Sequence, residues 1–214
     1  MSHAPAMPHG KLDEVFDNVF VVRSSFRVGP GITFDRNMTV VRDGGELVVI
    51  ASARLSDAGE AELDKLGKVK HVVRVAAFHG ADDPYYVERY GAKLWQPADA
   101  AAPIGKVFRF DKGNQAETAL LLPHADGVLV TGDSFQNWTD LSTCSLLARM
   151  MMPIMGFKGG VVGGPWLKKM GPAIRADYDR LFELAFKHVI PGHGTVVRDT
   201  GPAAVRAAVA KAKF

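Results

Sequence analysis

Four side chains of the kinds that bind metal ions follow short apolar runs in three separated segments of the chain. His79 and Asp83 lie in the segment FHGADD, Asp133 ends the segment VTGD, and His193 lies in the segment PGHG. Each segment contains glycine near the end of a predicted strand, and loops at the edge of a sheet can bring such side chains to one pocket. Imidazole and carboxylate groups are ligands of Zn, Fe and Mn. The pattern therefore predicts a metal site at a sheet edge.

The length and composition predict one globular domain with an ordinary core. The chain has 214 residues, of which 47% are hydrophobic and 23% charged, and these values are typical of globular proteins. We expect a flexible leader over 1–17 and a single domain over 18–214. The net charge of +3 is small, and no dense run of Lys and Arg predicts a nucleic-acid partner.

Cysteine usage and the apolar runs bear on the compartment. Cys144 is the single cysteine, so no intrachain disulfide can form, and we expect an inert buried thiol. The first ten residues lack the apolar stretch of a signal peptide. No apolar run approaches the ~20 residues that span a bilayer. These features predict a cytoplasmic protein without a membrane partner.

Apolar alternation and turn residues predict a mixed α/β chain. The DGG sequence at 43–45 predicts a hairpin, and Ser56 or Asp57 can cap a helix that runs to Leu66. Strands are expected at 19–23, 26–28, 37–42, 46–51, 69–77, 92–95, 107–110, 117–122, 127–131 and 187–190. Further helices are expected at 83–89, 141–152, 167–187 with a break at 171–172, and 201–213.

Two segments late in the chain have unusual compositions. The segment 157–165 contains two Gly-Gly pairs and is expected to form a mobile loop. The segment 150–155, MMMPIM, is rich in methionine, which fills irregular gaps in cores. We expect it to serve packing or a contact between two copies of a homodimer rather than a lid.

These segments, in this order, resemble the metallo-β-lactamase superfamily. The resemblance runs from about residue 18 to the final helix, and it rests on the hairpin strands NMTVV and GELVVI and on the segments VTGD and PGHG. It implies an αββα sandwich, in which two facing β-sheets are flanked by helices and the metal site lies at one edge.

The chain departs from the signature of that family, His-x-His-x-Asp-His. Aligned with it, the segment HGADDP keeps His79 and Asp83 but has Ala81 and Pro84 in place of the other two histidines. The middle histidine of the family has no clear counterpart. Glu117 and His124 are the nearby polar candidates to replace it.

The resemblance implies a reduced, mononuclear site. Asp83, Asp133 and His193 would hold one Zn, Fe or Mn ion, and His79 would assist. A bound cation supplies hydroxide at neutral pH, and His79 or Asp83 would orient the water or accept its proton. The expected substrate is a small ester, thioester, lactone or phosphoester.

A second interpretation needs no metal. The loss of two signature histidines, at Ala81 and Pro84, favours a non-catalytic binding protein that kept the fold and lost the ion. Asp83 precedes Pro84 and can instead cap a helix, and Asp133 can bond its own loop as an Asx turn.

Overall fold

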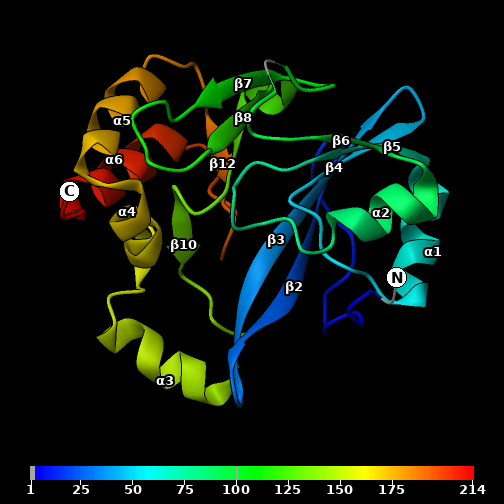
Figure 1. Ribbon diagram of the computed structural model, residues 1–214, viewed down its shortest axis with the longest axis horizontal. Coiled ribbons are helices and arrows are strands. Elements are labelled where there is room, and N and C mark those ends of the chain that lie inside the picture. The colour runs from blue at the N-terminus through cyan, green and yellow to red at the C-terminus, as the bar shows by residue number, and fades with distance from the viewer. Residues whose placement is uncertain (1–2, 100) are drawn as a thin grey trace.

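The strands of the N-terminal half form one six-stranded sheet in the computed structural model, which describes residues 3–99 and 101–214 (Figure 1). Its order is β1 (Asp13–Phe16), β2 (Val19–Gly29), β3 (Ile32–Asp43), β4 (Glu46–Ile50), β5 (Lys68–Val73) and β6 (Lys93–Trp95). Pairing is antiparallel from β1 to β4 and parallel from β4 to β6. The expected hairpin is confirmed, because Asp43 pairs with Glu46 across two glycines of positive φ.

Two expectations near the N-terminus were wrong. The strands expected at 19–23 and 26–28 are one continuous strand, β2. The leader expected to be flexible over 1–17 contains β1, which pairs with β2, and His9 bridges to Ser24. Its first two residues lie outside the described part of the chain. Pairing with the edge of β2 satisfies main-chain groups, which orders a polar segment that has little core of its own.

A second sheet of four strands faces the first. Its order is β12 (His188–Ile190), β9 (Val128–Thr131), β8 (Thr118–Leu122) and β7 (Lys106–Arg109). A separate two-stranded ribbon pairs β10 (Gln136–Trp138) with β11 (Gly159–Val161). The strand β11 lies within 157–165, so the expectation of a mobile loop there was wrong for these three residues. The pair Gly159 and Gly160 lies in this strand, and the pair Gly163 and Gly164 lies at the start of the following helix.

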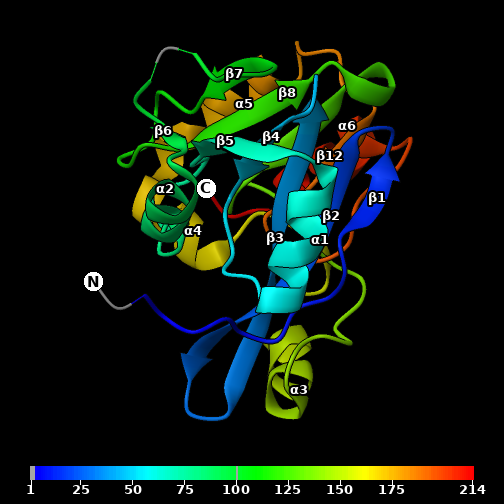
Figure 2. The same ribbon diagram turned by 90° about the vertical axis from the view of Figure 1, so that its right-hand side faces the viewer.

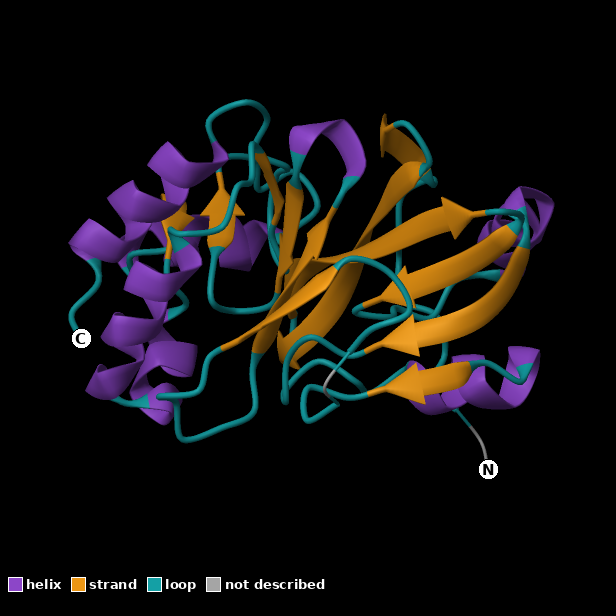
Figure 3. Cartoon of the chain, turned by 90° about the horizontal axis from the view of Figure 1, so that it is seen from above, coloured by secondary structure: helices purple, strands orange, loops and turns teal. Residues whose placement is uncertain are grey.

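Strand periodicity explains how the layers stack. In β2, Val19 and Val21 face the second sheet, whereas Phe20 and Val22 face the helices α1 (Asp57–Leu66) and α2 (Asp83–Tyr90). On the outer side of the second sheet pack α4 (Gly164–Met170), α5 (Arg175–Leu181) and α6 (Gly201–Lys211). Figure 3 shows the helices on both sides of the strands. The expected αββα sandwich is confirmed.

The helix α3 (Leu146–Ile154) departs from this layered arrangement. It lies beside the far end of the β2–β3 hairpin, away from the other helices (Figures 1 and 2). It begins later than expected because the Ser145 hydroxyl accepts a hydrogen bond from the N–H of Ala148 and caps the first turn. Within the described residues, no helix combines the length and apolar character needed to cross a bilayer.

Two short 3-10 helices connect the remaining elements of the fold. The break expected at 171–172 within the helical segment 167–187 is confirmed, because Gly171 has φ +82° and Pro172 follows it, and the segment contains two helices, α4 and α5. A short 3-10 helix, η2 (Pro172–Ile174), joins them, and another, η1 (His124–Asp126), joins β8 to β9.

Candidate metal site

Three of the four predicted ligands meet where strands of both sheets end. His79 follows β5, Asp133 follows β9, and His193 follows β12. One ligand atom from each lies within 4.8 Å of the other two. The side chains retain exposures of 12%, 15% and 6%. A small ion or molecule therefore has access to a site that is otherwise buried.

The carboxylate of Asp133 lies between the two imidazoles. Its Oδ2 is 3.2 Å from Nε2 of His79, and its Oδ1 is 3.0 Å from Nε2 of His193. The side-chain amide of Gln136 also donates to Oδ1, over 2.8 Å. The two imidazole rings are 5.0 Å apart and nearly perpendicular, at 74°. Both Nε2 atoms thus point at one shared centre.

The protonation of this cluster follows from its contacts. Burial alone would raise the pKa of Asp133, but hydrogen bonds from His193 and His79 outweigh it and hold that pKa well below its usual range. Burial alone would lower the pKa of His193, but its contact with Asp133 raises that pKa above the ordinary value. The carboxylate of Asp133 and the imidazole of His193 therefore each favour the charged form of the other.

Close backbone packing fixes the loop that carries His193. A Cβ at Gly192 would lie 2.7 Å from the carbonyl oxygen of Gly132, and one at Gly194 would lie 1.9 Å from that of Asn137. Gly194 also has φ +83°. The PGHG segment is thus glycine-rich because two other strands' ends pass directly against it.

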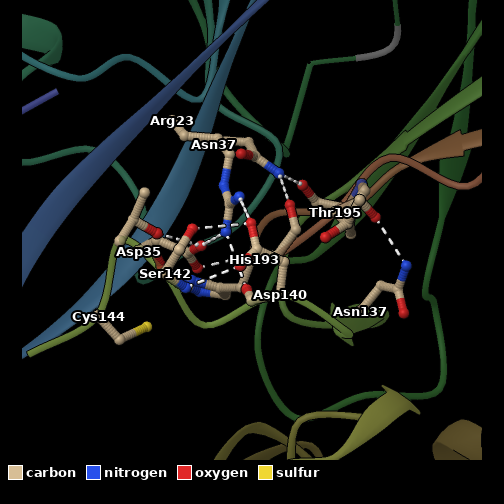
Figure 4. A network of polar contacts seen from close by, with 12 residues as sticks. Arg23, Asp35, Asn37, Asn137, Asp140, Ser142, Cys144, His193 and Thr195 are labelled. Carbon is tan, nitrogen blue, oxygen red and sulfur yellow. Dashed lines mark hydrogen bonds and ion pairs between the residues drawn. The ribbon is translucent and has the colours of Figure 1, made fainter. Parts of the chain in front are cut away.

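Polar residues of β3 hold the same loop from the other sheet. The buried amide of Asn37 donates to the carbonyls of Pro191 and Gly194, each over 2.8 Å. The carbonyl of Asp35 accepts from Nδ1 of His193 over 2.6 Å. Figure 4 shows Asp35 in contact with Arg23, which also pairs with Asp140. Sequence reasoning missed these positioning residues, although polar side chains within an apolar core strand were a signal.

Aromatic side chains form the walls of the site. The indole of Trp138 stacks on the His193 ring at 5.4 Å and 18°, and Phe26 approaches the same ring at 5.4 Å. A cavity of about 70 Å³ lies against both imidazoles, between Phe26, Arg36 and Phe78. Its size suits a small reacting group rather than a whole large substrate.

Asp83 does not join the other three ligands, which corrects the expected ligand set. Its side chain is fully buried, and its two oxygens accept from the Ser52 hydroxyl at 2.6 Å and from Nε of Arg74 at 2.7 Å. Nor does it cap α2, because Asp83 is the first helical residue and Asp82 precedes it. The first turn of α2 places the carboxylate between the Ser52 hydroxyl and the Arg74 guanidinium. The geometry favours a structural ion pair for Asp83 over a catalytic role.

The two candidates for the missing middle ligand lie at opposite ends of β8. His124 follows β8 in η1, and a five-residue strand spans about 17 Å, so His124 lies far from the cluster. Glu117 precedes β8 and is 2% exposed. Burial, and then the charge of Asp133, raise its pKa well above the usual value. Within the described ranges, neither Glu117 oxygen has a well-formed hydrogen bond, although the Trp166 indole faces the carboxyl group.

Comparisons with known proteins identify the fold. The sequence matches no protein-family model, and no curated protein matches it. The structure is similar to that of the metallo-β-lactamase DIM-1, with a TM-score of 0.61, 12% identity, and coverage of 99% of this chain and 100% of the other.

Two further solved structures give the same result. The metallo-β-lactamase FIM-1 from Pseudomonas aeruginosa, in its mono-zinc form, has a TM-score of 0.60 at 12% identity, with 96% of each chain covered. A metallo-β-lactamase from Hirschia baltica has a TM-score of 0.58 at 14% identity, with 96% and 97% covered. The chain therefore has the metallo-β-lactamase fold, as its motifs predicted.

Proposed function

We propose that this protein of metallo-β-lactamase fold is a hydrolase that binds one divalent ion, Zn, Fe or Mn, through His79, Asp133 and His193. The observation that carries the proposal is the convergence of two imidazole nitrogens and a carboxylate within 4.8 Å at the edge of both sheets. Three protein ligands with open positions for water are the arrangement that catalytic metal sites use.

The donor set fits such an ion. A carbonyl can only accept, so the 2.6 Å contact with Asp35 requires that Nδ1 of His193 carries a proton. In neutral His193 the lone pair then lies on Nε2, the atom that faces Asp133. Metal-binding histidines characteristically donate their other N–H to a carbonyl or carboxylate in this way. Neutral imidazole and ionised carboxylate together suit a divalent ion of intermediate hardness, such as Zn, Fe or Mn.

Different residues of the chain would have different roles in hydrolysis. A divalent ion bound there would supply a water whose pKa is lowered towards neutrality. His79 lines the cavity and, as one of the residues that would hold the ion, would position that water. Arg36 lines the same cavity, and its guanidinium, which also pairs with Asp82, would orient a carbonyl or phosphoryl oxygen. Phe26 and Phe78 would limit the entry of bulk water.

For the substrate we propose a small ester, thioester, lactone or phosphoester. The small volume beside His79 supports a compact reacting group. That FIM-1, which shares the fold, has been solved in a mono-zinc form supports a function that uses a single ion. We propose the cytoplasm as the compartment, which the single buried cysteine, Cys144, supports.

One observation favours the alternative of a non-catalytic binding protein. Asp133 already contacts both imidazoles and the amide of Gln136. This group can satisfy its own charges and hydrogen bonds without an ion. In that case the cavity would bind a ligand through hydrogen bonds to His79 and Arg36.

Metal analysis separates the two functions. We would measure metal content by inductively coupled plasma mass spectrometry after incubation with Zn, Mn and Fe(II), for the wild type, Asp133→Ala and His193→Ala. The matched control is His124→Ala, which removes an imidazole at the other end of β8. About one ion per chain in the wild type and in His124→Ala, lost in the other two, supports the hydrolase. No ion in the wild type overturns it.

A further inference from the structure

The helix α3 exposes an unusually apolar surface. Among the described residues, nine large hydrophobic side chains are strongly exposed, and six of them lie between 146 and 155. We call these six the α3 surface: Leu146, Leu147, Met150, Met151, Ile154 and Met155. Ile154 is 88% exposed and Leu146 is 74% exposed. Such a concentration of apolar side chains marks an interaction site rather than ordinary surface.

The helix is held firmly in place, so this exposure does not come from a frayed segment. Ala148 and Met152 on its inner side are fully buried against Trp138. The main-chain N–H of Thr33, in β3, donates to the Ser145 hydroxyl over 3.1 Å, and the Ser145 N–H donates to the Thr33 carbonyl over 3.1 Å. The α3 surface is thus presented to solvent on a rigid support.

The two chain segments that carry this surface and the adjoining groove have charges of one sign. The chain has five basic residues and no acidic residue from 141 to 176, and three basic and no acidic residues from 201 to 214. Both segments border one groove of about 830 Å³, which begins at Met155 in the α3 surface and is distinct from the metal site. Its cationic lining is Lys158, Lys168, Lys211 and Lys213.

We propose that the α3 surface and the lysines of the adjoining groove dock this protein on a lipid bilayer with anionic headgroups. An amphipathic helix binds a bilayer by burying its apolar face at the boundary of headgroups and acyl chains. Lysines near an anionic membrane add about 1 kcal/mol each. The α3 surface supplies the apolar part, and Lys158 and Lys168 supply the charge.

The same charges disfavour the binding of a second copy of the chain to the α3 surface. A twofold contact through the α3 surface would set this cationic region against itself, and juxtaposed like charges oppose association. The sequence predicts no membrane partner because it has no spanning segment. Peripheral docking needs no span, only an exposed apolar helix with cations beside it, and the exposure is a property of the folded chain.

Vesicle sedimentation tests the proposal. We would compare vesicles of phosphatidylcholine alone with vesicles that also contain phosphatidylglycerol. The wild type should sediment with the anionic vesicles and be released by salt. Leu146→Ser with Ile154→Ser should weaken binding at least about tenfold, because two apolar side chains no longer enter the boundary. Lys158→Gln should weaken binding roughly fivefold.

A matched control uses Val87→Ser, which changes an exposed apolar side chain on α2 and should bind like the wild type. Circular dichroism and thermal unfolding establish that each variant is folded. Equal binding of the wild type and the double variant would overturn the proposal, as would no binding to anionic vesicles. A dimer in sedimentation equilibrium that the double variant converts to monomer, without vesicle binding, would identify a second copy as the occupant instead.

Discussion

The Nδ1–H group of His193 donates to the main-chain carbonyl of Asp35 over 2.6 Å, across the interface between the two sheets. The carboxylate of Asp35 also accepts from the N–H of Gly194, over 3.1 Å. One residue of β3 therefore fixes both the ring of His193 and the loop that carries it. The arrangement sets the tautomer of His193 with no titratable partner at Nδ1, because a carbonyl cannot donate.

Substitution of Asp35 tests this positioning. Asp35→Asn removes a fully buried charge that pairs with Arg23. We expect a loss of about 3 kcal/mol in the free energy of unfolding, because the guanidinium loses one of its two carboxylates. We also expect metal affinity to fall about 10- to 100-fold, because the main-chain carbonyl of Asp35 remains but would shift relative to His193 once the side chain no longer pairs with Arg23.

Urea unfolding of the apoprotein and competition with a chromophoric chelator measure the two effects separately. Asp43→Asn, at the exposed hairpin turn, is the control and should leave both unchanged. Unaltered stability and affinity in Asp35→Asn would contradict a positioning role.

Asp83 should matter for stability and not for metal binding. Its oxygens contact Ser52 and Arg74 and lie outside the ligand group. Asp83→Asn should therefore keep the metal content of the wild type but lower the free energy of unfolding by about 3 kcal/mol, because Arg74 loses its charged partner.

A double variant isolates that pair. Asp83→Asn combined with Arg74→Met should be less destabilised than the sum of the single variants, because neither charge is left unpaired. Loss of metal in Asp83→Asn, with stability unchanged, would restore the sequence-based ligand set.

Asp140 should make stability depend on pH below about 4. Hydrogen bonds from the Ser142 N–H, and then from Arg23, lower its pKa to about 2. Because the folded-state pKa is depressed, the stabilisation is present above the ordinary value and is lost as the pH falls through about 2. The side chain is 46% exposed, so solvent screening limits the effect to about 1 kcal/mol.

The measurement compares the free energies of unfolding of the wild type and Asp140→Asn from pH 7 to pH 2. The difference in the free energy of unfolding between the two proteins should be about 1 kcal/mol at pH 7 and should disappear between pH 4 and pH 2. Asp179→Asn, which removes a well-exposed helical pair with Arg175, is the control. A gap that stays constant with pH would show that Asp140 acts by packing alone.

Local chemistry explains the predictions that succeeded. The DGG turn determines the β3–β4 hairpin, because two glycines readily adopt the positive φ that a tight turn needs. Ser56 begins α1 by accepting from the N–H of Gly59. Each of these signals involves only a few neighbouring residues, so it can be read completely from the sequence.

Tertiary structure decided which polar side chains share the site. The sequence placed His79, Asp133 and His193 at strand ends, but it also offered Asp83 as a ligand and Glu117 or His124 as replacements for the missing one. Whether a side chain reaches the cluster depends on its position within a helical turn or on the end of the strand that carries it. These positions differ by several ångströms between the candidates.

The sequence by itself therefore determined most of the elements and, through its motifs, predicted the fold and the three residues that converge in the candidate site. Only the packed structure excluded Asp83 from it, buried Glu117 beside it, and left the α3 surface uncovered. The physical reason is the separation in sequence of the residues that interact. Turns, caps and alternation depend on near neighbours, whereas the convergence of ligands and the exposure of side chains depend on how strands and helices far apart in the chain pack together.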